Sequence, residues 1–500
     1  MPANAAAQDE PVAITASLRS SYVNNGAELV AYRLDSSSHA AVQDLLSMYN
    51  PLIGPVRKAI TYFGGSGSLP VHVGHSEFYD LDYVLRHITG LSSFDSGAAR
   101  TLFAGGKGAD THGMFISSVA ETVERVLGSL SYFDKLNDYV AGTYDELTRR
   151  GFPCLAPEDL PLFSDEQYAD PDFLYEPFTR STPVAWMRGD RLISGDEVWL
   201  PAQLVELVYP AGPDEALIGY SVSGGLSSHI SRREALFHGI TECLERDAVN
   251  LRWHCGIPPR RIVIDSPPES VKLRRLLDAV ERLPGKMSFY EHALDVPEVP
   301  VVTAIEVDPW LNRFSYYSGG GADINIDLAL TKALGEFGQA ERPIRMAVHA
   351  PERYVSQAVM RLFDIDPDES AKKINLFFKV IAYYGYRQNA PKLDWYTTGG
   401  GEVPLSELPR PRFGSSGDKY DFVLDIVRQR GLDPIVFDMT PPQMKQGKLM
   451  KVFFPDLTQP FIQSSPILGH PRFREMPQAL GERDTPMPYG ELLQDPLPYP

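Results

Sequence analysis

The chain has 500 residues, of which 43% are hydrophobic and 22% are charged, so it can bury a large core and has no general tendency to disorder. Its formal net charge of −18 at pH 7 argues against nucleic acid as the main partner, because phosphate backbones bind basic surfaces. The three cysteines have no CxxC spacing, which argues against a disulfide framework or a structural zinc site and favours a reducing compartment.

The first residues carry no targeting signal. MPANAAAQDEP lacks a basic region followed by an apolar one, and no apolar run in the chain approaches the length of a membrane span. We therefore expect a soluble, cytoplasmic protein without a membrane partner. Residues 1–44 are interpreted as an N-terminal extension, partly disordered and available for a partner contact, with weak strand patterning over 11–35.

A short amphipathic helix is expected at 39–49, and a glycine-rich stretch follows at Ala104-Gly-Gly-Lys107-Gly108. Glycines around a lysine allow the backbone to approach a phosphate. The stretch is not a Walker A loop, because Thr101 stands where the first glycine is required and Gly108 replaces the Ser/Thr. A plain turn before a helix is the alternative interpretation.

Acidic residues then recur with helical spacing. The chain reads Glu121-x-x-Glu124-Arg125, later Glu242-x-x-Glu245-Arg246, and finally Glu336-x-x-Gln339. Residues three apart share one helix face, so each segment predicts a helix with an apolar back and an acidic front. One such face is usually solvated surface. Three converging faces would suit a magnesium ion and a polyphosphate.

The rest of the chain predicts mixed secondary structure. Residues 151–216 are interpreted as loops with short strands, and KLMKVFFPDL as a strand entering a turn. Helices are expected at 327–341, 366–376 and 416–431, and proline-punctuated coil after 470. Since no clean linker divides the chain, we expect one large α+β domain over residues 45–500.

The loop and helix SGGLSSH…GITECLERDA resemble the YcaO family of ATP-dependent enzymes that modify peptide backbones. The residues that fit this motif are Ser223, Gly225, Ser227, Ala235, Gly239, Glu242, Glu245, Arg246, Asp247 and Ala248. GGKG…SSVAETVER and LALTKALGEFGQ resemble two further motifs of the family, and the likeness runs over roughly 45–500. It implies a YcaO-type domain with mixed sheets and acidic helices that enclose an ATP and magnesium site.

The chain ends in Pro496-Leu-Pro498-Tyr-Pro500. Proline-rich ends are commonly disordered, but this one resembles the PxPxP tail of YcaO members that form azoline rings. The resemblance implies that the tail reaches the catalytic centre.

The resemblance and the charges together assign residue roles. Magnesium is assigned to Glu121, Glu124, Glu242, Glu245 and Glu336. Nucleotide contacts are assigned to Lys107, Ser118, Arg125, Ser223, Ser227, Arg246 and Gln339. Catalytic roles go to Arg246, Pro496, Pro498 and Pro500, and Asp247 is expected to orient Arg246. Two departures from the family pattern, His229-Ile230 and Lys332, bear on the nucleotide contact. His72 and His75 are interpreted as structural, and His254-Cys255 as packing.

The activity implied is an ATP-dependent cyclodehydratase. It would phosphorylate backbone amide oxygens of a ribosomal precursor peptide so that Cys, Ser or Thr side chains form thiazoline or oxazoline rings, a step towards azole antibiotics. A thioamide- or amidine-forming relative and a non-catalytic nucleotide- or precursor-binding scaffold remain alternatives. Implied partners are the precursor, a separate leader-peptide-binding protein related to ubiquitin-activating enzymes, a flavin dehydrogenase and a second copy of the chain in a homodimer.

Overall fold

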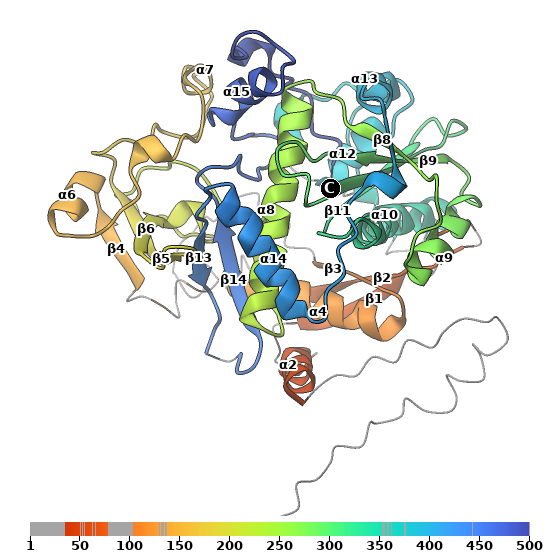
Figure 1. Cartoon of the computed structure of the whole chain (residues 1–500), viewed down its shortest axis with the longest axis horizontal. Coiled ribbons are helices and arrows are strands. Elements are labelled where there is room, and N and C mark those ends of the chain that lie inside the picture. Colours follow the sequence, from red (N-terminus) through yellow and green to blue (C-terminus); the bar gives the residue numbers. More distant parts are fainter. Residues whose placement is uncertain are drawn as a thin grey trace, which may run out of the picture.

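The computed structural model describes residues 36–78 and 104–499, except for residue 443 and for single residues and short stretches within 51–66, 130–137, 353–362 and 375–376. The strand patterning expected at 11–35 and the last proline, Pro500, lie outside the described residues. Among the helices that the structure describes, none is both long and apolar enough to cross a membrane. Helices and three sheets build one α+β domain (Figure 1).

The first sheet is antiparallel and carries the glycine-rich stretch. Its order is β1-β2-β3, with bounds β1 (Val56–Tyr62), β2 (His72–Phe78) and β3 (Ala104–Gly108). Helix α4 (Thr111–Gly128) begins at Asp110, whose side chain accepts the Gly113 N–H at 2.7 Å. The expected apolar back of α4 is confirmed, because Val119, Val123 and Val126 are buried. Helix α2 (Ser36–Ser47) lies against α4 and matches the helix expected at 39–49.

The second sheet has the order β4-β5-β13-β14-β7, with β6 on β5. Its strands are β4 (Tyr139–Gly142), β5 (Val184–Arg191), β6 (Glu197–Pro201), β7 (Leu226–His229), β13 (Ile435–Asp438) and β14 (Lys448–Phe453). Short helices α6 (Tyr144–Arg149) and α7 (Asp165–Tyr168) interrupt the loops near this sheet. The strand expected in KLMKVFF is β14, which lies between β13 and β7.

The third sheet has the order β11-β10-β9-β8-β12. Its strands are β8 (Arg260–Val263), β9 (Lys286–Glu291), β10 (Val301–Val307), β11 (Tyr316–Ala322) and β12 (Glu402–Pro404). The helices around it are α9 (Val271–Val280), α10 (Ile326–His349), α12 (Phe377–Tyr384), α13 (Asp394–Thr398) and α14 (Ser416–Gln429). Strand β11 is glycine-rich and entirely buried, so α10 can pack directly on its backbone.

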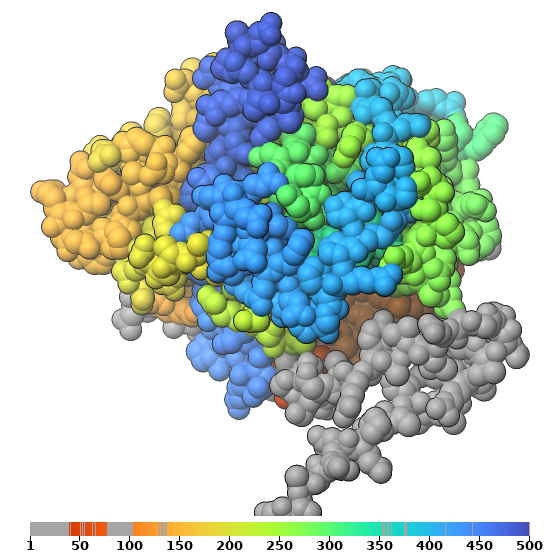
Figure 2. Space-filling model, viewed as in Figure 1, coloured from red at the N-terminus to blue at the C-terminus, as the bar shows by residue number. Residues whose placement is uncertain are grey.

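Helix α8 (Arg232–His254) joins the two larger sheets. In Figure 1 it runs through the middle of the molecule, with β5, β13 and β14 on one side and β8, β9 and β11 on the other. Most of its buried apolar residues belong to the core around the third sheet, and it also packs on β14. In Figure 2 the blue residues of the last quarter of the chain cover the front of the molecule, between the orange and the green parts.

Two expectations about helices are wrong. Of the helix expected at 366–376, the described residues 366–374 form turns and one short 3-10 segment, Ala371–Lys373, instead of a helix. After 470 the chain is not all coil, since α15 (Arg472–Ala479) buries Phe473 and Met476 against the end of α8. The helices expected at 327–341 and 416–431 are confirmed as α10 and α14. Other 3-10 segments are η4 (Pro157–Asp159), η5 (Ala202–Leu204), η7 (Ala390–Leu393), η8 (Leu405–Glu407) and η9 (Tyr489–Glu491).

Candidate functional site

The acidic faces of three helices meet at one cavity of 1270 Å³. The lining includes five carboxylates that the sequence singled out, two on α4, two on α8 and one on α10: Glu121, Glu124, Glu242, Glu245 and Glu336. The repeated sequence pattern thus corresponds to three walls of one site rather than to separate solvated surfaces.

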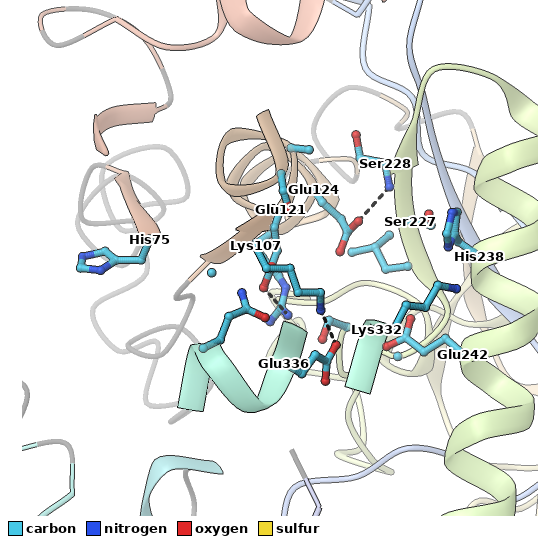
Figure 3. A pocket seen from close by; sticks show the side chains of 18 of the residues that line it. His75, Lys107, Glu121, Glu124, Ser227, Ser228, His238, Glu242, Lys332 and Glu336 are labelled. Atoms are coloured by element: carbon cyan, nitrogen blue, oxygen red, sulfur yellow. Dashed lines mark hydrogen bonds and ion pairs between the residues drawn. The ribbon is translucent and has the colours of Figure 1, made fainter. Parts of the chain in front are cut away.

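The wall formed by β3 and α4 carries both basic and acidic side chains. Lys107 on β3 donates to Glu336 Oε1 of α10 at 2.7 Å, and Arg125 donates to Glu121 Oε1 at 3.2 Å. Glu124 accepts the backbone N–H of Ser228 at 2.8 Å. Figure 3 shows Lys107 and Glu336 pointing toward each other across the cavity, and Glu124 reaching toward the strand that carries Ser228.

The wall from α8 is joined to the glycine loop that precedes β7. The Gly225 N–H donates to Glu242 Oε2 at 3.0 Å. Gly225 has φ +78°, and a Cβ there would lie 2.3 Å from the Val452 carbonyl oxygen, so the loop can take this path only with glycine. Arg246 lies one turn beyond Glu242, with 3.9 Å between guanidinium and carboxylate.

The third wall, formed by α10, carries Lys332, one of the two departures from the family pattern. Lys332 on α10 lines the cavity, but its ammonium group is bound to Asp323 at 2.9 Å and to the Ala322 carbonyl at 2.8 Å. The other departure lies at the end of β7: His229 Nδ1 is 2.6 Å from Glu234 Oε2, and its ring stacks on His238. Burial holds the pKa of His238 well below its usual value, so this ring is neutral.

Burial raises the pKa of three carboxyls in the cavity. It raises the pKa of Glu124 to about 8 and that of Glu245 to about 7, and the pKa of Glu121 also lies above its usual value. Neighbouring arginines oppose these shifts without cancelling them. Burial therefore favours the neutral form of these three carboxyls, and a divalent cation beside them would favour the ionised form.

The donor set fits magnesium together with a polyphosphate. Carboxylate oxygens are the ligands that Mg²⁺ prefers, and it usually takes one or two of them plus phosphate oxygens and water. In the part of the chain that the structure describes, no three His, Cys, Asp or Glu side chains form a group that could hold a metal by themselves. Arg125 lines the cavity, and its buried Nε has no hydrogen-bond partner among the described residues, so its guanidinium keeps an unused donor.

The segment Pro496–Tyr499 enters the same cavity, where Leu497 and Tyr499 line the wall. The Tyr499 hydroxyl donates to Glu245 Oε1 at 2.7 Å, and its ring lies 5.2 Å from the Arg246 guanidinium carbon. A Cβ at Gly320 on β11 would meet the Tyr499 hydroxyl at 2.0 Å. The glycine in β11 is therefore what leaves room for this side chain.

Buried donors satisfy the carbonyls of this segment one by one. Tyr384 donates to the Pro496 carbonyl and Tyr316 to the Pro498 carbonyl, each at 2.5 Å. Proline has no N–H, so once its carbonyl is bonded it leaves no unsatisfied backbone group in a buried channel. The one N–H between the prolines, that of Leu497, donates to Gln463 Oε1 at 2.8 Å. The alternation of proline and non-proline thus matches the donors around it.

Most, but not all, of the predicted site residues come together. Besides the five carboxylates, the cavity is lined by Lys107, Arg125, Ser223, Ser227, Arg246 and Gln339. Ser118 does not line it, because its side chain is buried beneath Gly106 of β3. Pro496 and Pro498 are buried behind Leu497 and Tyr499 rather than exposed to the cavity, and Pro500 is not among the described residues.

The expected role of Asp247 is wrong. Its carboxylate accepts two hydrogen bonds from Arg472, at 2.6 and 3.1 Å, and one from the Thr458 N–H at 2.8 Å. A helix turns about 100° per residue, so Asp247 faces away from Arg246 and instead holds α15 and the turn after β14.

The histidines interpreted as structural each contact a different neighbour. His75 Nδ1 is 2.5 Å from the Tyr62 hydroxyl, and His72 Nδ1 is 3.2 Å from Thr111 Oγ1. His75 lies at the far edge of the cavity in Figure 3, apart from the glutamates of α4, α8 and α10 that are labelled there. His254, interpreted as packing, is buried and also bonds the Leu493 carbonyl at 2.6 Å.

Sequence reasoning missed Lys451, Tyr316, Tyr384 and Gln463. Lys451 left one signal, a single charge inside the apolar run LMKVFF of β14. The two tyrosines and the glutamine have no distinguishing local pattern.

Comparisons with known proteins agree with this geometry. A solved heterocyclase in complex with substrate and cofactor has a TM-score of 0.71 at 18% identity, over 94% of this chain and 59% of that one. The structure of YcaO from Methanopyrus kandleri bound with AMPPCP and Mg²⁺ has a TM-score of 0.52 at 18% identity, over 82% and 88% of the two chains. At such identities the likeness shows the fold alone.

A relative in sequence is an uncharacterized protein of Methanothermobacter thermautotrophicus, 27% identical over 176 residues, which are 34% of this chain and 45% of that protein. The chain thus spans about half the length of this relative and 59% of the heterocyclase. The family described as YcaO cyclodehydratase, ATP- and Mg²⁺-binding, matches residues 105–458. These residues carry all three acidic helices and the glycine loop, and because the match takes in well over half of the chain, the protein belongs to the YcaO family.

Proposed function

We propose that the protein is an ATP-dependent cyclodehydratase that forms thiazoline or oxazoline rings in a ribosomal precursor peptide. The observation that carries this proposal is the 2.7 Å hydrogen bond from Tyr499 to Glu245. It joins a proline-alternating segment to the acidic wall of the cavity, in a family that binds ATP and Mg²⁺. The proline segment is what favours ring formation over thioamide or amidine formation.

We assign the charged lining to the nucleotide and its cation. Glu121, Glu124, Glu242, Glu245 and Glu336 would hold Mg²⁺ directly or through water, together with phosphate oxygens. Lys107, Arg125 and Arg246 would contact the phosphates, for which the planar guanidinium is suited to two parallel hydrogen bonds. Ser223, Ser227 and Gln339 line the same space and supply polar contacts.

The chemistry required is activation of a poor electrophile. Bound ATP would supply the phosphoryl group that turns an amide oxygen into a leaving group after a Cys, Ser or Thr side chain has added to the carbonyl. The chain's own contribution is positioning and charge, which dominate phosphoryl transfer. Arg246 faces both Glu242 and the Tyr499 ring, so it lies where negative charge on a reacting phosphate would develop. Pro496, Pro498 and Pro500 would act indirectly, by fixing Tyr499.

Partners and domain limits belong to the same proposal. We place the catalytic domain at 45–500 and treat 1–44 as an extension that contacts a partner. The solved heterocyclase with 18% identity contains substrate as well as cofactor, which supports a peptide path into the same cavity. A volume of 1270 Å³ exceeds the upper end of ordinary small-molecule sites, roughly 1,000 Å³, and leaves room for a peptide beside a nucleotide. A separate leader-binding protein would deliver that peptide.

The test is to incubate the protein with ATP, Mg²⁺, a leader-binding partner and a precursor peptide whose backbone amides carry oxygen-18. Loss of one water per ring, with the heavy oxygen recovered in phosphate, is the expected result. A gain of sulfur would indicate thioamide formation and overturn the ring proposal. Unchanged product with Glu245→Ala would contradict the site assignment, and peptide binding without any ATP turnover would favour the scaffold alternative.

A further inference from the structure

Lys451 is a buried cation without an acidic partner. It lies on β14, it is 3% exposed, and its ammonium group donates to the carbonyl oxygens of Val222 and Gly224, each at 2.7 Å. Among the described residues no carboxylate lies within ion-pair distance of it. A buried charge that is bound only to neutral carbonyls is costly, so its retention calls for a function.

Its position relative to the glycine loop is specific. Ser223 and Gly224 line the cavity, whereas Lys451 does not. The ammonium group therefore lies behind the loop, on the side away from the cavity, and holds two loop carbonyls toward itself.

Peptide geometry then fixes where the loop amides point. In a trans peptide the C=O and the N–H point in opposite directions. The Gly224 carbonyl points at Lys451, and the N–H of the same peptide unit, that of Gly225, points the other way and reaches Glu242, a cavity residue. The Val222 carbonyl also points at Lys451, so the N–H of Ser223 is turned toward the cavity as well. Within the described chain no hydrogen bond from the Ser223 N–H is found.

We propose that Lys451 is a positioning residue for the nucleotide site: it turns the Ser223 N–H into the cavity as a donor to a phosphate oxygen and places a positive charge behind that contact. This inference rests on the proposed ATP site and adds a phosphate cradle to it. Backbone N–H groups that converge in a glycine loop are effective anion donors.

The surrounding charges are compatible with a protonated ammonium group. Burial lowers the pKa of Lys451 to about 8, while Glu242 of α8 and Glu124 of α4 act in the opposite direction. Cys243 and Arg125 from the same two helices, and Glu206 behind the sheet, also face this lysine. The ammonium form therefore prevails at neutral pH, and phosphate in the cavity would favour it further.

The experiment compares two ligands on the full chain, ATP with Mg²⁺ and adenosine, which lacks phosphates. For Lys451→Met we expect ATP affinity to fall at least about tenfold, or about 1.4 kcal/mol, with adenosine affinity unchanged by ligand-observed NMR. Lys448→Met, on the same strand but outside the cavity lining, is the matched control and should change neither affinity. Should Lys451→Met fail to fold, Lys451→Gln, which keeps two donors without charge, replaces it.

Three outcomes distinguish the role of Lys451 from the proposed ATP-dependent function. ATP affinity within twofold of wild type in the Lys451 variant would overturn the positioning role while leaving the proposed function intact. An equal loss for ATP and adenosine would reduce Lys451 to a structural support of the loop and also overturn it. Failure of the wild-type chain to bind ATP with Mg²⁺ would instead overturn the proposed function. It would also overturn the phosphate contact proposed for the Ser223 N–H.

Discussion

Tyr499 donates a hydrogen bond of 2.7 Å to Glu245, a residue 254 positions earlier in the chain. The carboxylate is buried, and burial raises its pKa to about 7 even though this hydrogen bond and Arg246 act to lower it. The contact therefore joins two features that look unrelated in sequence, the proline-alternating end and the second acidic helix. It makes the ionisation of one proposed metal ligand depend on where the tail lies.

Removing this hydroxyl should change the pH dependence of the reaction. Mg²⁺ binds ionised carboxylates, so activity should rise with pH as Glu245 ionises near pH 7. A hydrogen bond to a charged group contributes about 1.5–3 kcal/mol, and about 1.4 kcal/mol is one pKa unit. Tyr499→Phe should thus raise the pKa of Glu245 and move the acidic limb of the ATP turnover profile up by about one to two pH units.

The control for that profile is Tyr386→Phe. The Tyr386 hydroxyl donates a hydrogen bond of 2.9 Å, to the Ile365 carbonyl rather than to a carboxylate, and Tyr386 does not line the cavity. Its removal should leave the acidic limb in place. A Tyr499→Phe profile that is lower at every pH but has the wild-type midpoint would contradict the link to Glu245.

The ion pair between Lys107 and Glu336 is expected to bind nucleotide rather than to stabilise the fold. Both side chains are about one third exposed, at 30% each, and exposed pairs contribute only about 0–1 kcal/mol to stability. Lys107→Met should therefore raise the KM for ATP by about tenfold or more with little change in the midpoint of thermal unfolding. Steady-state ATP turnover and calorimetry measure the two quantities.

The matched control for this pair is Lys372→Met. Lys372 forms an ion pair of similar length with Asp170, 2.6 Å, away from the cavity. It should change neither the KM nor the unfolding midpoint. If Lys107→Met lowers the midpoint but leaves the KM unchanged, the pair is structural and its assignment to phosphate is wrong.

The phenol donors along the tail give a separate test. Tyr316→Phe leaves the Pro498 carbonyl without its donor in a buried channel, which costs about 1–3 kcal/mol. Because Tyr316 itself does not line the cavity, we expect the turnover number for ring formation to fall about tenfold while ATP affinity, measured by titration calorimetry, stays unchanged. Weaker ATP binding with an unchanged turnover number would place the tail in nucleotide binding instead.

The sequence predicted the parts of the site that depend on local periodicity. Glu121 and Glu124 share a helix face because spacing alone determines it, and the same holds for Glu242 and Glu245. Contacts between elements that are distant in the sequence could not be predicted in this way. Ser118 has the same helical spacing as Glu121, yet β3 packs over it and removes it from the cavity.

The side chains that form hydrogen bonds with the backbone of Pro496–Tyr499 could not be predicted from the sequence either. Tyr384 on α12 and Gln463 in a loop bond the tail only because folding brings three segments together. The alternation of proline and non-proline residues, in contrast, is evident from the sequence alone. Local chemistry therefore indicated which segment was special, and only the tertiary structure shows which side chains satisfy it.

Glu206 provides a prediction about stability that is independent of the reaction. Its carboxylate is buried, accepts hydrogen bonds from Ser131 and Tyr139, and has its pKa raised to about 7 by burial. A carboxyl whose folded pKa lies above its unfolded value destabilises the fold as pH rises from the unfolded pKa, near 4.5, through the folded one. Its penalty is absent below about pH 4.5 and complete above about pH 7.

Glu206→Gln cannot ionise and should escape that penalty. The free energy of unfolding of the variant, relative to wild type, should thus be larger at pH 8 than at pH 5, by an amount on the order of 2–3 kcal/mol. Guanidinium unfolding at the two pH values measures it, and the raised carboxyls of Glu124 and Glu245 cancel in the comparison because both proteins contain them. A difference between variant and wild type that is the same at both pH values would show that Glu206 remains ionised in the folded protein, held so by the neighbouring ammonium groups of Lys135 and Lys451.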